Sequence, residues 1–254
     1  MRPFLFLAAA CVYMSAAFGQ GASGAGYVIA SGGVGDKQAI SAVAEQFTRL
    51  AGGRDKQFVL IPTAIDDARL DREALLREYK EALGTENITI LHTRDRQTAD
   101  SEQFIAPLKR ANGVWITGGQ PQRLVAAYVG TRTQRALQAV VDRGGVVEGD
   151  SAGAMILGAV VLFGERWGAP NPKGGFAILP NIIVSPHLSS KPGVEKWTRE
   201  LVDTAPNLTE LGIDDDAAVL LSGRHMRVIV GKALVHSRHA EDLRLTVGQE
   251  YEQH

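Results

Sequence analysis

The chain is almost free of cysteine, because its 254 residues contain only Cys11, in an apolar stretch near the N-terminus. A single cysteine cannot form an intrachain disulfide, and beyond Cys11 the chain has no thiol nucleophile and no thiolate metal ligand. Long hydrophobic runs are also scarce. The apolar run from Phe4 to Met14 is shorter than the roughly 20 residues that a membrane-spanning helix needs. These absences exclude a disulfide scaffold, a cysteine peptidase and a membrane span in the mature chain.

An excess of charge of either sign is absent as well. The formal net charge is −1, with 22% charged and 45% hydrophobic residues, which is ordinary for a globular protein. Nucleic acid and anionic membrane surfaces are therefore not expected as partners. No His, Asp or Glu cluster has convincing metal spacing, since the run Asp214–Asp216 lacks the glycine and the terminal glutamate of a calcium loop. We expect no metal and no cofactor.

The N-terminus has the layout of a secretory signal peptide. Arg2 precedes the apolar run, and the small residues Ser15, Ala16, Ala17 and Gly19 follow it. We therefore predict a signal peptide at 1–19, a flexible linker at 20–26, a single α/β domain at 27–248 and a polar tail at 249–254. The mature protein is expected to be secreted or periplasmic.

Apolar strands alternate with amphipathic helices through the first half of the domain. Strands are predicted at 27–30, 58–61, 88–91 and 114–116, and helices at 39–50, 67–83, 104–108 and about 121–141. This alternation is typical of a three-layer α/β sandwich around a mostly parallel sheet. The second half contains several short strands, which we expect at the antiparallel edge of that sheet. The glycines at 32, 33 and 35 lack the spacing of a dinucleotide-binding loop, so nucleotide binding is not favoured.

The segment Gly149-Asp150-Ser151-Ala152-Gly153 follows a β-branched run and leads into residues suited to a helix. This strand–turn–helix context is that of a nucleophile elbow, in which the central serine attacks a carbonyl. A glycine-rich turn with a serine cap is the alternative. The amide of Ala152, together with that of Gly119 at the end of the preceding strand, can form an oxyanion hole. Asp150 is expected to accept hydrogen bonds from backbone amides.

A serine needs a base to take its proton, and the base needs a carboxylate that orients it. His187 is the best candidate for the base, because it ends an apolar strand downstream of Ser151. For the acid we favour Glu165, which lies between the two in sequence. The rival acids are Asp214, Asp215 and Asp216, for which turn capping in solvent is the alternative role.

Five stretches of the chain form a recognisable pattern in their order and spacing: 114–119, Arg123-Leu124, 149–154, 179–187 and 212–215. Together they resemble the cyanophycinase and peptidase E family of serine peptidases, and the resemblance covers most of residues 27–236. It implies a fold similar to that of class I glutamine amidotransferases. It also implies Ser151 as nucleophile, His187 as general base, a downstream carboxylate such as Glu165, an oxyanion hole from Gly119 and Ala152, and no cofactor.

Three departures from the family pattern concern the substrate. Gln120 or Gln122 would replace a glutamine that helps to seat the substrate in cyanophycinases. Ser185 stands where those enzymes carry an aspartate that holds an arginyl group, and Lys191 stands among positions that carry arginines. Without that carboxylate, a charge-assisted contact to a guanidinium is lost. We therefore expect a substrate other than the β-aspartyl-arginine polymer.

The sequence thus predicts an exported serine peptidase that hydrolyses a peptide or isopeptide bond of an aspartyl-type substrate through an acyl-enzyme. Two alternatives remain open at this point: a catalytically inactive binding member of the same fold, and an esterase that acts on small esters. A homodimer is possible.

Overall fold

The computed structural model describes residues 26–163, 171–238 and 240–253. The predicted signal peptide and residues 20–25 of the linker lie outside the described residues. None of the helices in the described part of the chain is both long and apolar enough to cross a membrane.

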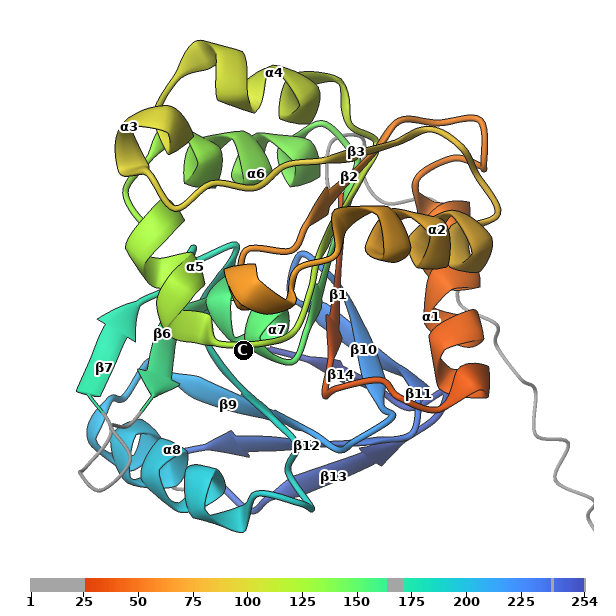
Figure 1. The fold of residues 1–254 in the computed structure, drawn as a ribbon. Helices are drawn as coiled ribbons and strands as arrows, with labels where there is room; N and C mark the ends of the chain where they lie inside the picture. Colours follow the sequence, from red (N-terminus) through yellow and green to blue (C-terminus); the bar gives the residue numbers. More distant parts are fainter. Residues whose placement is uncertain (1–25, 164–170, 239, 254) are drawn as a thin grey trace, which may run out of the picture.

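The larger of two sheets runs through the middle of the domain in the order β14-β11-β10-β1-β5-β4-β2-β3 (Figure 1). Its strands are β1 (Tyr27–Ser31), β2 (Phe58–Ile61), β3 (Ile88–Ile90), β4 (Gly113–Ile116), β5 (Val146–Asp150), β10 (Ala218–Ser222), β11 (His225–Val230) and β14 (Glu250–Glu252). The strands from β1 to β3 in this order are parallel, whereas β10, β11 and β14 continue the sheet antiparallel. The predicted mostly parallel sheet with an antiparallel C-terminal edge is confirmed. Strand β14 lies within the predicted polar tail, which is therefore part of the sheet at 250–252.

Helices cover both faces of this sheet (Figure 1). Helices α1 (Lys37–Leu50) and α2 (Arg72–Leu83) lie on one face; α3 (Arg96–Ala99), α4 (Glu102–Arg110), α5 (Pro121–Tyr128) and α6 (Arg132–Asp142) lie on the other. The single helix predicted at 121–141 is two helices, because the chain turns at Gly130, where φ is 80°. Under α1, the fully buried Phe47 packs against Phe58 and Trp115, with ring centroids 5.6 and 5.2 Å apart.

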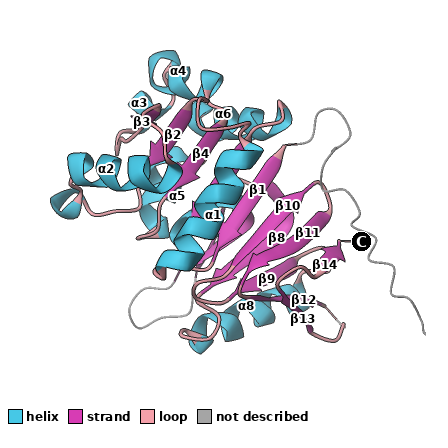
Figure 2. Cartoon of the chain, turned by 90° about the vertical axis from the view of Figure 1, so that its right-hand side faces the viewer, coloured by secondary structure: helices cyan, strands magenta, loops and turns pink. Residues whose placement is uncertain are grey.

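Six strands between residues 158 and 246 form a second sheet that the sequence pattern does not predict, while the strands at 218–222, 225–230 and 250–252 join the first sheet (strands in magenta in Figure 2). The order of the second sheet is β13-β12-β9-β8-β6-β7. The strands are β6 (Gly158–Phe163), β7 (Asn171–Gly174), β8 (Leu179–Pro186), β9 (Thr209–Ile213), β12 (Lys232–Ser237) and β13 (Leu243–Thr246), with helix α8 (Pro192–Thr204) packed against it. Apolar patterning identifies these strands but not the sheet that they join, because either sheet would bury them equally well.

The short helix α7 (Ala152–Leu157) joins the two sheets. It begins where β5 ends, leads directly into β6, and packs against β5, β6 and β8. Residues of both sheets and of α7 share one hydrophobic core. The carboxyl end of β5 in the first sheet is thereby held close to the carboxyl end of β8 in the second.

Candidate active site

Ser151 stands in a strained turn between β5 and α7. Its backbone has φ 50° and ψ −107°, a conformation that a residue with a side chain rarely adopts. The Ser151 amide donates to the Ser31 carbonyl at 2.9 Å, which ties the turn to the end of β1. A Cβ on Gly149 would lie 2.3 Å from the Gly153 carbonyl oxygen, and one on Gly153 would lie 2.1 Å from that of Ile116. The segment therefore has the tight geometry of a nucleophile elbow.

A hydrogen-bonded relay runs from this serine through an imidazole to a carboxylate. Ser151 Oγ lies 2.8 Å from His187 Nε2, and His187 Nδ1 lies 2.6 Å from Asp215 Oδ1. Because a carboxylate can only accept, the proton sits on Nδ1, and Nε2 is left free to accept the serine proton. This is the arrangement of nucleophile, base and orienting acid in serine hydrolases.

The acid of the relay is Asp215, one of the three rivals weighed against Glu165. Glu165 itself lies outside the described residues. Strands β8 and β9 are parallel neighbours, with Pro186 paired to Ile213, so the residues that follow them meet at one edge. Hydrogen bonds from His187 and Ser190 hold the pKa of Asp215 below its usual value, so its carboxylate is ionised at neutral pH.

The loop that follows β1 packs against the imidazole ring of His187. A Cβ on Gly33 would lie 2.2 Å from Cε1 of His187, so the ring rests directly on this glycine. The His187 amide donates to the Gly32 carbonyl at 3.1 Å, and the Asp216 amide donates to the Gly33 carbonyl at 3.1 Å. The sequence analysis considers these glycines only as a nucleotide-binding loop and does not predict their contact with His187. Their position after the first strand, at the sheet edge that also carries Ser151, is the feature that could have indicated it.

Two acids on β5 lie behind the serine. Asp150 accepts from the Val34 amide at 3.0 Å, as its predicted backbone-bonding role requires, and burial raises its pKa to about 6. Glu148 is fully buried and accepts from the Ser31 hydroxyl at 2.8 Å. Burial, and then the neighbouring Asp150, raise the pKa of Glu148 well above its usual value. The carboxyl groups behind the serine are therefore less readily ionised than Asp215.

The loop Gly118–Gly119 lies against the serine from the side of β4. A Cβ on Gly118 would be 3.3 Å from Cβ of Ser151. Gly119 is exposed beside the elbow, and Ala152 is the first residue of α7. Both predicted oxyanion donors thus come from segments that adjoin Ser151.

The predicted substrate-binding residues differ in their placement. Gln120 is exposed and its amide donates to the Ala64 carbonyl at 2.9 Å, while Gln122 is exposed on the first turn of α5. Lys191 is exposed, and its amide donates to the His187 carbonyl at 2.8 Å. Ser185 is a correction: it is 2% exposed and donates to Thr198 Oγ1 under α8, so its hydroxyl is turned away from the site.

Metal ligation has no candidate in the described ranges: no three His, Cys, Asp or Glu side chains there are grouped so that they could hold a metal ion. The chemistry that the relay supports on its own is nucleophilic attack by a serine hydroxyl with proton transfer through an imidazole.

Fold and relay together define a serine-type hydrolase with a class I glutamine amidotransferase-like fold. The model of peptidase family S51 matches residues 27–229, and the chain belongs to this family of peptidases. It is 28% identical to the cyanophycinase of Synechococcus elongatus over 220 residues, which are 83% of this chain and 67% of the relative. It is 27% identical to that of Trichormus variabilis over 216 residues, covering 82% and 72% of the two chains.

Solved structures agree with this assignment. The crystal structure of a peptidase from an acI-B1 Actinobacterium superposes with a TM-score of 0.76 at 25% identity, covering 91% of this chain and 98% of that one. A putative peptidase E protein from Listeria monocytogenes shares the fold, with a TM-score of 0.56 at 16% identity and coverage of 80% and 98%. The expected family and fold are confirmed.

Replacing Gly33 with alanine tests the support under the imidazole. The new methyl group would occupy the space of His187 Cε1, and a φ of 109° disfavours any side chain there. We expect Gly33→Ala to lower kcat by about 100-fold, the effect of a displacement near 1 Å at a catalytic group. Gly35→Ala is the matched control, since its nearest atom would be 3.9 Å away, and it should keep full activity. Equal activity of the two variants would contradict the supporting role of Gly33.

The raised pKa of Asp150 predicts a pH-dependent stability. Between the ordinary value of 3.8 and about 6, the folded state binds more protons at this residue than the unfolded state, so rising pH destabilises the fold. Above pH 6 the loss is complete and amounts to at most about 3 kcal/mol. Asp150→Asn should weaken this fall in the free energy of unfolding, measured by urea titration from pH 4 to 8. Parallel curves for the variant and the parent protein would disprove the effect.

Proposed function

We propose that this S51 peptidase is an exported enzyme that hydrolyses a peptide or isopeptide bond of an aspartyl-type substrate through an acyl-enzyme. The observation that carries the proposal is the relay from Ser151 Oγ through His187 to Asp215, with successive distances of 2.8 and 2.6 Å. The fold of the family alone does not require that these three side chains be hydrogen-bonded to one another in this order.

Each member of the relay has a distinct role in the proposed reaction. Ser151 Oγ attacks the carbonyl carbon as His187 Nε2 takes its proton. Asp215 keeps the proton on Nδ1 and stabilises the imidazolium that forms. The imidazolium then protonates the leaving amine, which departs from the acyl-enzyme. Water attacks the ester with the same imidazole as base, and the acid product and free serine are released.

Negative charge develops on the carbonyl oxygen during both steps. The amides of Gly119 and Ala152 are the proposed donors to this oxyanion, because both residues belong to segments that adjoin Ser151. Preorganised amides of this kind stabilise the transition state and so lower the activation barrier, typically by about 3 kcal/mol for one donor.

The aspartyl character of the substrate rests on the similarity to proteins named cyanophycinase. The departure around Lys191, where cyanophycinases carry arginines, supports a substrate other than the polymer itself. Export rests on the N-terminal sequence alone, with its basic start, apolar run and small residues at 1–19.

Replacing the nucleophile tests the proposal directly. Ser151→Ala should lower kcat for an aspartyl dipeptide by roughly 10⁴- to 10⁶-fold and abolish labelling by a serine-directed fluorophosphonate. Ser185→Ala is the matched serine control and should be labelled as the parent protein is. A screen of α-aspartyl, β-aspartyl and p-nitrophenyl ester substrates separates a peptidase from an esterase. A folded parent protein that shows no labelling and no turnover would indicate an inactive binding protein.

Two carboxylate substitutions test which acid orients the imidazole. Asp215→Asn removes the acceptor that fixes the proton on Nδ1, so kcat should fall by about 10⁴-fold with little change in KM. Glu165→Gln should leave kcat within about twofold of the parent value. The reverse pattern would return the role to Glu165. Circular dichroism of both variants excludes unfolding as the cause of any loss.

A further inference from the structure

A cavity of about 380 Å³ has Gly119, one of the two proposed oxyanion donors, in its lining. It is lined by the loop after β2 (Ala64, Ile65, Asp66 and Arg69) and by Gly119, Gln120 and Arg123. Gly119 is shared with the proposed oxyanion hole, and a Cβ on the preceding Gly118 would lie 3.3 Å from Cβ of Ser151. A substrate carbonyl held at Gly119 therefore has this cavity beside it.

The wall of the cavity is held in place by two arginines. Arg94 donates to the Thr63 and Ile65 carbonyls and pairs with Asp67 at 2.7 Å. Arg123 donates to the Ala64 carbonyl at 3.2 Å and pairs with Asp66. Such a preorganised wall needs little reordering when a ligand binds.

The charges in the cavity do not cancel. Its carboxylate, that of Asp66, already accepts from Arg123 and from the Ala68 amide, the latter at 3.0 Å. Arg69, on the one-turn 3₁₀ helix η1 (Asp67–Arg69), is exposed and has no ion pair or side-chain hydrogen bond with any residue that the structure describes. Its guanidinium is therefore the one cation of the lining left available to a ligand among these residues.

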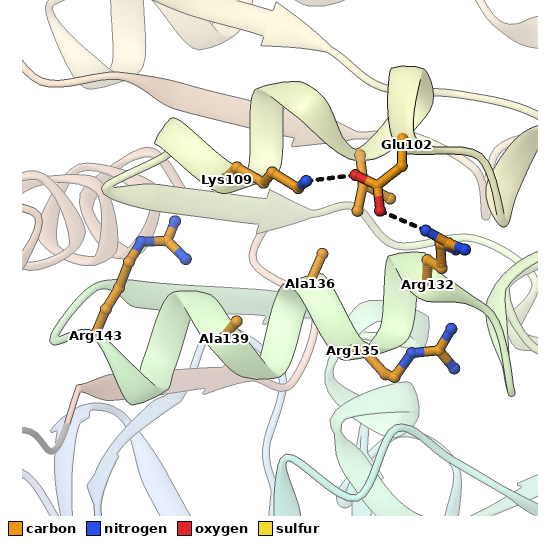
Figure 3. A pocket seen from close by; sticks show the side chains of 8 residues that line it. Glu102, Lys109, Arg132, Arg135, Ala136, Ala139 and Arg143 are labelled. Carbon is orange, nitrogen blue, oxygen red and sulfur yellow. Dashed lines mark hydrogen bonds and ion pairs between the residues drawn. The ribbon is translucent and has the colours of Figure 1, made fainter.

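The larger hollow between α4 and α6, of about 560 Å³, differs in this respect (Figure 3). Lys109 and Arg132 both pair with Glu102, as the dashed lines in Figure 3 mark. Arg143 donates to the carbonyls of Leu108 and Ala111. The positive charge in that hollow is largely engaged by the protein itself, and the relay residues do not line it.

We propose that Arg69 and the loop 64–69 form the subsite that recognises a carboxylate on the acyl residue of the substrate. A guanidinium binds a carboxylate through two parallel hydrogen bonds, which gives direction as well as affinity. Gln120, at the rim of the same cavity, offers an amide beside it. The inference rests on the proposed function and specifies its substrate: the residue whose carbonyl is attacked is anionic.

Two substrates carry this chemistry. In an α-aspartyl peptide the free carboxylate is the side chain, and in a β-aspartyl isopeptide it is the main-chain carboxylate. The cavity is assigned to the shared group, and assays with both substrates identify which of the two the enzyme prefers.

The test compares Arg69→Gln with Arg72→Gln, an arginine three residues further along the chain that does not line the cavity. For the preferred aspartyl substrate, Arg69→Gln should raise KM by about 10- to 100-fold, which corresponds to the loss of a hydrogen bond between charged groups. KM for the matching asparaginyl substrate and the rate of labelling by a neutral fluorophosphonate should not change. Arg72→Gln should change neither.

Binding of succinate provides a readout that needs no turnover. Calorimetry on the full chain should detect succinate with the parent protein and Arg72→Gln but not with Arg69→Gln. An equal change for aspartyl and asparaginyl substrates, or unchanged succinate binding in Arg69→Gln, would overturn the subsite. Absent labelling of Ser151 in the parent protein would instead reject the proposed function, and succinate binding would still decide the role of Arg69.

Discussion

The site depends on the contact between the loop after β1 and the imidazole of His187. The Gly32 carbonyl accepts the His187 amide, and the Gly33 backbone lies directly beneath the ring. One residue earlier, the Ser31 carbonyl accepts the Ser151 amide. Serine and histidine come from different sheets, so neither sheet alone sets the distance between them. The end of β1 does, because it binds both turns.

This arrangement keeps two unfavourable backbone conformations in place. Ser151 and His187 have φ of 50° and 61°, and such conformations cost about 1–3 kcal/mol each unless the surroundings enforce them. Here the strained residues donate their amides to consecutive carbonyls, that of Ser31 at the end of β1 and that of Gly32 directly after it. Both residues follow the end of a strand, and the positive φ values turn their side chains toward each other. The hydrogen bonds to Ser31 and Gly32 stabilise both turns.

Local patterns in the sequence predict the parts of the site that depend on neighbouring residues. Ser151 follows from its pentapeptide, and His187 follows from its place at a strand end. Asp215 does not, because the choice among three consecutive aspartates depends on long-range contacts. Asp214 accepts from Ser189, Asp216 accepts from the amides of the β1–α1 loop, and Asp215 alone meets the imidazole. The split into two sheets escapes the pattern for the same reason: apolar strands do not specify their partners.

Environment, rather than residue type, assigns the acids their charge. Asp215 is exposed and receives donors from His187 and Ser190, so it stays ionised. Glu148 is buried with a single hydroxyl donor, so its neutral form is favoured. Asp150 lies between these extremes, since the Val34 amide partly offsets its burial. The same loop that positions the imidazole thus also distributes amide donors among the acids, which concentrates negative charge at the far end of the relay, where an imidazolium needs it.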